Sequence, residues 1–283
     1  MQKLDRLGWA AGLAITAYGV RIGIRVNEPD VLQQIRGNLP PTWKLASSPQ
    51  VDIIYSLLVG GAGPRQGVRR FNVLYANAAR LARYLDLDEV LAAFESSMHL
   101  SIAELAPRRV FVHAGVVAWR GQALLIPGHS HSGKSTLVAA LVQAGATYYS
   151  DEYAAIDRQG RVHPYPKPLS LRHGPGERAM RYSVESLGGR AGSRPLPISL
   201  VLLSHYKAGA MWQPRRLSAG RGILALLAHT VSARRQPAVA FSTLRQVAAH
   251  AVIIKGVRAE AHEVAPRLLA SLEQPGSHEP VAQ

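Results

Sequence analysis

Residues 128–136 read Gly128-His129-Ser130-His131-Ser132-Gly133-Lys134-Ser135-Thr136. They match the phosphate-loop pattern G-x-x-x-x-G-K-[ST] at every fixed position. The apolar run 123–126 before them predicts a buried strand, and residues 137–141 after them predict a helix that ends near Gly145. This strand–loop–helix context indicates a nucleotide phosphate-binding loop, whereas a Gly/Ser-rich turn that matched by chance would lack it.

The fixed residues of this loop suit a polyphosphate for separate physical reasons. Gly128 and Gly133 allow backbone angles that a side chain would block. Successive N–H groups then point into a concavity at a helix N-terminus, where the helix dipole favours anions. Lys134 adds a charge for the β- and γ-phosphates, and the Ser135 hydroxyl is placed to bind Mg²⁺. We therefore expect ATP and Mg²⁺ here. The other positions expected to line the nucleotide are Ser130, Ser132 and Thr136.

The composition favours anionic partners. The chain has 283 residues, with 33 Lys and Arg against 18 Asp and Glu, which gives a formal net charge of +15. The excess is spread along the chain as arginine pairs, a pattern typical of a solvated basic surface, and no recognisable nucleic-acid module accompanies it. We therefore expect nucleotides and acidic peptides as partners, and no specific nucleic acid.

The residues that the sequence lacks narrow the class of protein further. Without cysteine, disulfides, Cys-based zinc sites and thiol nucleophiles are excluded. No apolar run is long enough to span a bilayer. Residues 8–20 faintly mimic a signal peptide, but they continue into the alternating residues 20–26, which indicate a half-buried strand. Because an ATP-binding loop also needs a nucleotide-containing compartment, the expected location is the cytoplasm.

The pattern changes near residue 107 and predicts two domains. An N-terminal α/β lobe is expected over residues 1–106, a P-loop catalytic domain over 107–275 and a tail over 276–283. In the lobe, strands are predicted at 13–27, 51–59 and 70–75, and helices at 31–37, 77–84 and 87–106, the last with Asp88 as N-cap. The lobe carries no acid–base or metal constellation, so its expected role is substrate docking or assembly.

The second domain predicts an α/β sheet built around the loop. Strands are predicted at 110–119, 122–126, 147–149, 196–203 and 252–254, and helices at 137–141, 220–229, 242–250 and 259–272. The strand–helix–strand series at the loop implies a right-handed crossover to a parallel neighbour. Asp151 would then lie at the carboxyl end of its strand, the edge where open α/β sheets bind ligands. The acid and the loop are therefore expected to face one site.

Several side chains near this site are candidates for the chemistry. Asp151 and Glu152 form a pair in which one acid takes the acceptor's proton and the other binds Mg²⁺; the alternative is a single metal-binding acid with an exposed neighbour. His113 lies on the strand predicted at 110–119, and its side chain reaches the site if this strand pairs with the one at 122–126. The alternative is that His113 has a structural role. Three prolines in residues 161–172 favour a shaped loop rather than a central strand. Lys167 and Arg172 in this segment are candidates to clamp a phosphate or an acidic substrate, and the alternative is that they are ordinary loop cations.

The residues also resemble a known family. The resemblance lies in His113-Ala114-Gly115-Val116, Leu124-Leu125-Ile126-Pro127-Gly128, Gly133-Lys134-Ser135 and Ser150-Asp151-Glu152, within roughly residues 107–272. It is to the catalytic domain of the HPr kinase/phosphorylase family, and more to its divergent relatives, some of which phosphorylate precursor peptides in natural-product clusters. The resemblance implies a fold akin to phosphoenolpyruvate carboxykinase and ATP- and Mg²⁺-dependent phosphorylation of a serine hydroxyl.

Carried over by position, the family's roles fall on residues already singled out. Lys134 and Ser135 match the phosphate and metal residues, Asp151 matches the proton acceptor, and His113 matches the family histidine near it. Glu152 stands where the family has a second Asp, and Thr136 where the regulator has an acidic residue. The glycine-rich signature of true HPr kinases is absent, so HPr itself is not the expected substrate.

These observations predict an HPr-kinase-like serine kinase, a phosphotransferase that uses an alcohol as acceptor. The expected acceptor is a serine of a peptide or protein, a natural-product precursor peptide among them. Two alternatives stay open: a small-molecule kinase on the same scaffold, and a nucleotide-binding regulatory protein without transfer chemistry. The sequence leaves the oligomeric state open, a homo-oligomer included.

Overall fold

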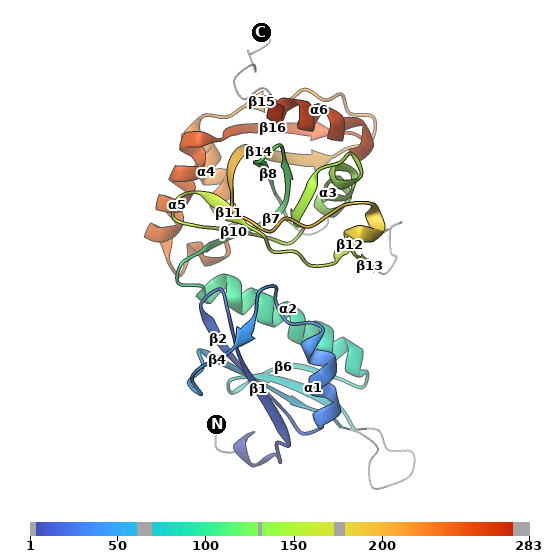
Figure 1. Cartoon of the computed structure of the whole chain (residues 1–283), viewed down its shortest axis with the longest axis vertical. Coiled ribbons are helices and arrows are strands. Elements are labelled where there is room, and N and C mark those ends of the chain that lie inside the picture. The colour runs from blue at the N-terminus through green and yellow to red at the C-terminus, as the bar shows by residue number, and fades with distance from the viewer. Residues whose placement is uncertain (1–3, 61–69, 130–131, 173–178, 274–283) are drawn as a thin grey trace. The chain divides into compact units, whose positions relative to one another are not determined.

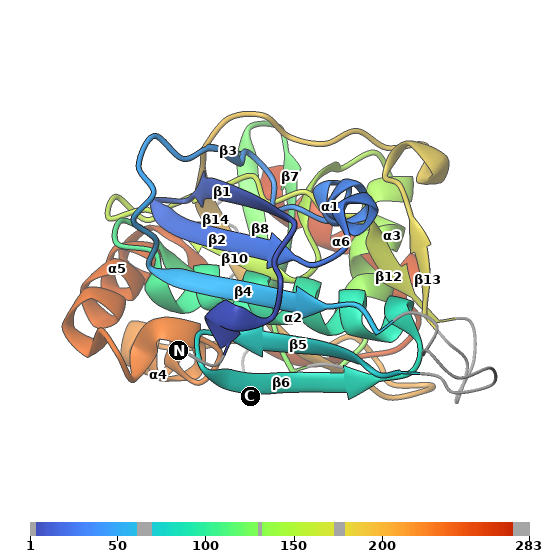
Figure 2. The ribbon, with the colours of Figure 1, turned by 90° about the horizontal axis from the view of Figure 1, so that it is seen from below.

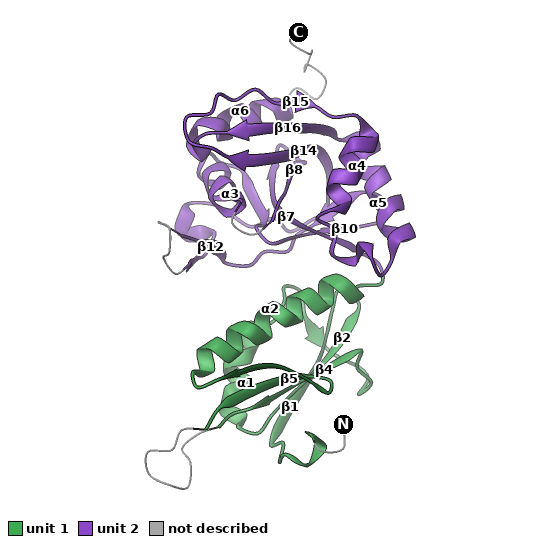
Figure 3. Cartoon of the chain, turned by 180° about the vertical axis from the view of Figure 1, so that it is seen from behind, with its two compact units in different colours: residues 1–107 green, residues 108–283 purple. Residues whose placement is uncertain are grey.

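The structure is a computed structural model that describes residues 4–60, 70–129, 132–172 and 179–273 (Figure 1). The chain divides into two compact units, Met1–Pro107 and Arg108–Gln283, which Figure 3 colours separately. Both units mix helices with β-sheet. Across the described ranges, no helix combines the length and the apolar character needed to cross a membrane.

The N-terminal unit is a mixed sheet with two α-helices. Its strands are β1 (Ala11–Ala17), β2 (Val20–Val26), β3 (Lys44–Leu45), β4 (Ile53–Leu58), β5 (Asn72–Ala76) and β6 (Ala79–Tyr84), and its helices are η1 (Leu4–Arg6, a 3₁₀ turn), α1 (Pro29–Arg36) and α2 (Leu87–Leu105). The sheet order is β3-β1-β2-β4-β5-β6, as Figure 2 shows for its larger strands. β2 and β4 are parallel because α1 crosses between them, and the other neighbours are antiparallel.

Two predicted elements of this unit are corrected. The single strand expected at residues 13–27 is a hairpin, because Tyr18 and Gly19 turn the chain with φ of 51° and 85°. The helix expected at 77–84 is wrong: β6 lies there and pairs with β5 across a turn at Asn77, whose φ is 51°. Sheet pairing thus overrides the helix propensity of an Ala/Arg/Leu run.

The helix predicted at residues 87–106 is confirmed as α2, but its N-cap lies two residues earlier than expected. Asp86 is the N-cap, and its carboxylate accepts the N–H of Asp88 at 2.9 Å. The geometry matches the ordinary capping pattern, in which the side chain reaches the second residue after it. Asp88 itself lies in the first turn, where its charge favours the helix dipole.

The second unit surrounds a larger sheet. Its strands are β7 (Val110–Trp119), β8 (Gln122–Pro127), β9 (Thr147–Ser150), β10 (Tyr153–Ile156), β11 (Arg161–His163), β12 (Leu169–Leu171), β13 (Met180–Tyr182), β14 (Leu196–Tyr206), β15 (Arg215–Arg216) and β16 (Val252–Arg258). Its helices are α3 (Lys134–Gln143), α4 (Ala219–Leu227), α5 (Pro237–His250) and α6 (Ala261–Glu273), with 3₁₀ turns η2 (Glu185–Leu187) and η3 (Val231–Ala233). The predicted strands and helices of this domain are therefore confirmed, with shifted ends.

The strand order is β11-β10-β7-β8-β14-β16-β15, with β9 also paired to β7. β11 pairs with β10 on one side and with β14 on the other, so β10, β7, β8, β14 and β11 form a closed ring. β8, β14 and β16 run parallel, and their carboxyl ends at Pro127, Tyr206 and Arg258 reach the same edge. This edge is where an α/β sheet places ligands.

The crossover predicted after the loop is only partly right. β9 is not the neighbour of β8, because the short turn at residues 120–121 places β7 against one side of β8 and β14 takes the other. β7 lies between β8 and β9 and is antiparallel to both, so β8 and β9 still point the same way. Asp151 therefore follows a strand that ends at the same edge as the strand before the loop.

Alternating side chains along the strands divide the core of this unit between two faces. On β8, Leu124 and Ile126 belong to one cluster, which α3 and α6 cover. Ala123 and Leu125 belong to the other, which contains residues of α4 and α5. Figure 1 shows these helix pairs at separate places around the sheet. Both faces of β8 are therefore buried, which is why the strand reads as a continuous apolar run.

Candidate phosphate-binding and catalytic site

The phosphate loop connects the carboxyl end of β8 to the first residue of α3. Gly133 is the N-cap of α3, with φ of 80° and no side-chain cap. A Cβ there would lie 2.5 Å from Arg258 Nη2, so both its backbone angle and its surroundings require glycine. The N-cap residue itself offers no side-chain cap to the first N–H groups of α3, and N–H groups at a helix N-terminus favour an anion.

Gly128 is required for a different reason from the one predicted. Its φ lies outside the left-handed region, but a Cβ would lie 2.7 Å from Ser132 Oγ. That hydroxyl oxygen is buried and has no hydrogen-bond partner in the described part of the chain. A tight cradle with an unpaired hydroxyl fits a phosphate oxygen. Of the other predicted loop residues, Ser130, with its neighbour His131, lies outside the described residues.

Lys134 is buried at the start of α3, with 7% of its surface exposed. Its ammonium donates a hydrogen bond to the carbonyl of His129 at 2.7 Å, across the loop. Burial lowers the pKa of Lys134, while the charges of Asp151 and Glu152 oppose that shift. The amine therefore faces both predicted acids and sits within the loop that it was expected to serve. Thr136, two residues on, is exposed.

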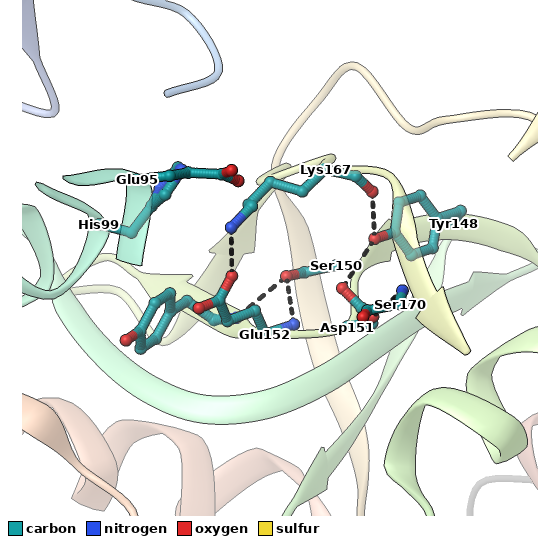
Figure 4. Close-up of polar contacts among 9 residues, drawn as sticks. Glu95, His99, Tyr148, Ser150, Asp151, Glu152, Lys167 and Ser170 are labelled. Carbon is teal, nitrogen blue, oxygen red and sulfur yellow. Dashed lines mark hydrogen bonds and ion pairs between the residues drawn. The ribbon is translucent and has the colours of Figure 1, made fainter. Parts of the chain in front are cut away.

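Asp151 lies beside the loop, as expected. Its side chain is 8% exposed and accepts hydrogen bonds from the Tyr148 hydroxyl and the Ser170 N–H, each at 3.2 Å (Figure 4). Burial raises the pKa of Asp151, and Ser170, Ser135 and Tyr148 lower it. The acid after β9 therefore lies near the first turn of α3, which carries Ser135.

Glu152 is held differently from Asp151. The chain bends after β9, and the Glu152 carboxylate forms an ion pair with Lys167 Nζ at 2.5 Å (Figure 4). Lys167, a predicted phosphate clamp, is thus engaged by an acid in this structure, and its role toward phosphate stays a prediction. Arg172, the other predicted clamp, is exposed just after β12.

His113 lies on β7, which pairs with β8, so the condition set for its reaching the site is met. Burial lowers its pKa to about 4, helped by the positive charges of Lys134, His229 and His129. Its backbone joins two segments of the site: the N–H donates to the carbonyl of His229 at 2.8 Å, and the carbonyl accepts the N–H of Gly128 at 3.2 Å. His113 therefore stands beside the lysine as a neutral imidazole.

The sequence did not point to three of the residues found here. Tyr148 is 1% exposed, and its hydroxyl also donates to the carbonyl of Lys167 at 2.7 Å. The ring of His229, just after α4, lies 4.6 Å from that of His129, centroid to centroid. Arg258, at the end of β16, contacts the carbonyl of Gly133. None belongs to a motif, and the strand predicted at 252–254 ended before Arg258, so no sequence signal marked it.

The donor set decides which metal the site suits. Ser135, Asp151 and Glu152 supply hydroxyl and carboxylate oxygens, which Mg²⁺ prefers. Within the described ranges, no three His, Asp or Glu side chains gather as a metal cluster. A divalent cation would therefore depend on phosphate oxygens as well, the usual arrangement for Mg²⁺ with a nucleotide.

Comparisons with known proteins give one distant structural likeness to report. No protein-family profile matches the chain, and no curated protein matches its sequence. Among solved structures, the chain is similar to the Hpr(Ser) kinase/phosphatase from Coxiella burnetii, with 13% sequence identity and a TM-score of 0.31. The similarity covers 58% of this chain and 93% of that one.

Proposed function

We propose that the second unit is an ATP- and Mg²⁺-dependent kinase that transfers the γ-phosphate to a hydroxyl. The observation that carries this proposal is the nearness of Asp151 to Ser135 and to the buried amine of Lys134, because Ser135 acts on the pKa of Asp151 and Asp151 acts on that of Lys134. A phosphate loop alone supports binding only. An acid near the first turn of the loop's helix supports transfer, because it can reach the group bound there.

In the proposed reaction, the backbone N–H groups of the loop and the Lys134 ammonium hold the phosphates of ATP. Asp151 accepts the proton of the acceptor hydroxyl as its oxygen bonds to the γ-phosphorus. The bond between that phosphorus and the β–γ bridging oxygen breaks, and ADP leaves. General-base help of this kind contributes about 10²–10⁴ in rate. Burial, which raises the pKa of Asp151, makes it a better proton acceptor.

Ser135 and Glu152 are the residues proposed to hold Mg²⁺, which would neutralise phosphate charge when bound. Glu152 reaches the metal only after its carboxylate turns from Lys167, with which it pairs at 2.5 Å. Lys167 remains a proposed phosphate contact, as the sequence suggested. The neutral imidazole of His113, whose pKa the charge of Lys134 helps to lower, is proposed to assist Asp151.

The proposed acceptor is a serine of a peptide or protein. A net charge of +15 favours acidic substrates, and the family resemblance implies a serine hydroxyl. A precursor peptide of a natural-product cluster is the candidate that the resemblance suggests, with the N-terminal unit as docking element. Phosphorylation of a small molecule on the same scaffold is the alternative acceptor chemistry.

The test is transfer of label from γ-labelled ATP with Mg²⁺ in a cell lysate, by wild type and by Asp151→Asn. A labelled peptide or protein with wild type alone supports the proposal. A labelled metabolite selects the small-molecule alternative. Nucleotide binding without any label selects the regulatory alternative. Equal labelling by the two proteins would remove Asp151 from the chemistry.

A further inference from the structure

Arg258 is the most deeply buried cation beside the phosphate loop. It ends β16 with 2% of its surface exposed, and its Nη2 donates a hydrogen bond to the carbonyl of Gly133 at 2.7 Å. Nη1 donates to the carbonyl of Ala259 at 3.1 Å. Nε is buried and has no partner within the described residues. A guanidinium is thus fixed in one orientation by two backbone carbonyls.

The charge at this place is unfavourable without an anion. Arg258 lies at the N-terminal end of α3, where the helix dipole is already positive, and Lys134 is buried at the same end. Glu260 favours the charged form of Arg258, but its carboxylate Oε1 accepts the hydroxyl of Tyr206 at 2.7 Å. Two buried cations at one helix N-terminus are an arrangement that a polyanion would compensate.

The contact also fixes the direction of an N–H group. In a planar trans peptide, the carbonyl of one residue and the N–H of the next point in opposite directions. The carbonyl of Gly133 accepts both Arg258 and the N–H of Leu137, at 3.1 Å. The N–H of Lys134 in the same peptide group therefore points away from Arg258, outward from the helix N-terminus. This is the N–H that a phosphate at the loop would meet.

We propose that Arg258 is the positioning residue of the phosphate loop: its guanidinium fork fixes the peptide between Gly133 and Lys134 so that the loop binds polyphosphate. This rests on the proposed function, since it presumes that the loop binds phosphate. It also adds a reason for Gly133 besides its φ, because a Cβ there would lie 2.5 Å from Arg258 Nη2. Arg258 acts through the loop and is not assigned contact with the substrate.

The test is calorimetric titration with inorganic triphosphate and Mg²⁺. Arg258→Met removes the fork, Arg258→Lys keeps the charge without the fork, and Arg267→Met removes a charge from an exposed position on α6. We expect both Arg258 variants to bind triphosphate about tenfold or more weakly, the effect of losing one hydrogen bond to a charged group. Arg267→Met should bind as wild type does.

A second readout separates positioning from a general loss of structure. Triphosphate should shift the amide NMR resonance of Lys134 in wild type and shift it less in Arg258→Met. The thermal midpoint is followed in parallel, because removing Arg258 takes one donor from the carbonyls of Gly133 and Ala259 and lowers stability by a separate route. If Arg258→Met does not fold, Arg258→Lys decides by the same two measurements.

Three results would overturn the role assigned to Arg258, and a fourth would overturn the proposed function. Full affinity in Arg258→Lys would show that charge alone suffices, and full affinity in Arg258→Met that neither matters. An equal loss in Arg267→Met would reduce the effect to net charge. If wild type itself does not bind triphosphate, the proposed function fails, and the role of Arg258 fails with it for that separate reason.

Discussion

Gly115 on β7 lies so close to Val138 on α3 that a Cβ on the glycine would be 2.6 Å from Val138 Cγ2. Gly115 also pairs with Ile126, two residues before the loop. The helix that carries Lys134 and Ser135 therefore rests directly on the backbone of β7. The absence of a side chain at one position sets how near the loop comes to the acid after β9.

Gly115→Ala is expected to lower the free energy of unfolding by about 1–3 kcal/mol, the usual cost of overpacking a core. Because α3 must move to admit the methyl group, the affinity for triphosphate should fall as well. Urea unfolding and calorimetry measure the two effects. Gly220→Ala is the control: a Cβ there meets nothing within 4 Å, and the helix should gain about 0.5–1 kcal/mol. Unchanged triphosphate affinity in Gly115→Ala would show that the packing of Gly115 against Val138 does not affect the binding site.

Tyr148→Phe is expected to move the pH dependence of phosphate transfer. The Tyr148 hydroxyl donates to Asp151 at 3.2 Å and is one of the contacts that lower the pKa of Asp151 against the effect of burial. Without it that pKa rises further, so activity should begin to fall at a higher pH on the acid side. Tyr149→Phe, which loses a bond to the carbonyl of Arg194 instead, should leave the profile in place. Coincident profiles for all three proteins would contradict this role.

Asp157→Asn is expected to destabilise the second unit by about 2–3 kcal/mol at neutral pH, the scale of lost charged hydrogen bonds. The Asp157 carboxylate accepts the N–H groups of Gln159 and Arg161 at 3.0 Å each and contacts the Arg161 and His163 side chains. Burial acts to raise its pKa, but these contacts outweigh burial and hold the pKa below its ordinary value.

The pH dependence of that destabilisation follows from the direction of the shift. A lowered folded-state pKa contributes stability above the unfolded pKa of about 3.9, and this contribution disappears as pH falls through the folded value. The difference between wild type and Asp157→Asn should therefore be constant from neutral pH to mildly acidic pH and shrink below about pH 4. If the difference in the free energy of unfolding stays constant below about pH 4, the destabilisation by Asp157→Asn comes from packing and not from the charge of Asp157.

His113 is expected to titrate near pH 4 when followed by NMR of its ring, because burial and then the charge of Lys134 lower its pKa to about 4. An unfolded histidine titrates near 6.5, so the folded state loses stability as pH falls between about 6.5 and 4. Lys134→Met should move the midpoint upward, since one of the opposing charges is removed. A titration midpoint near about 6.5 in wild type would show that His113 is neither buried nor close to the charge of Lys134.

The sequence was most informative where the chemistry is local. The phosphate loop is one contiguous segment, so the pattern at 128–136 and its flanking periodicities were enough to predict β8 and α3. Asp151 was predicted as a site residue because it follows a predicted strand, and the end of a strand can be recognised from the sequence pattern. The helix wrongly expected at 77–84 shows the limit: its Ala/Arg/Leu run favours helix, and only its pairing with β5 makes it a strand.

The residues missed at the site are those that long-range pairing brings in. Arg258 contacts Gly133 across a separation of 125 residues, and Tyr206 arrives beside it only because β14 and β16 pair in parallel. A buried arginine at a strand end has no sequence signature of its own. Tyr148 precedes Asp151 by three residues, yet its hydroxyl meets the acid only because the chain bends after Ser150.

The ring formed by β10, β7, β8, β14 and β11 has a mechanical meaning. In a closed ring of strands, sliding any one strand would break its backbone hydrogen bonds to the strands on both sides. The spacing between the loop and the acid is therefore a property of the scaffold, maintained before any substrate arrives. Under the proposed function, different acceptors would therefore meet the same arrangement of loop and acid.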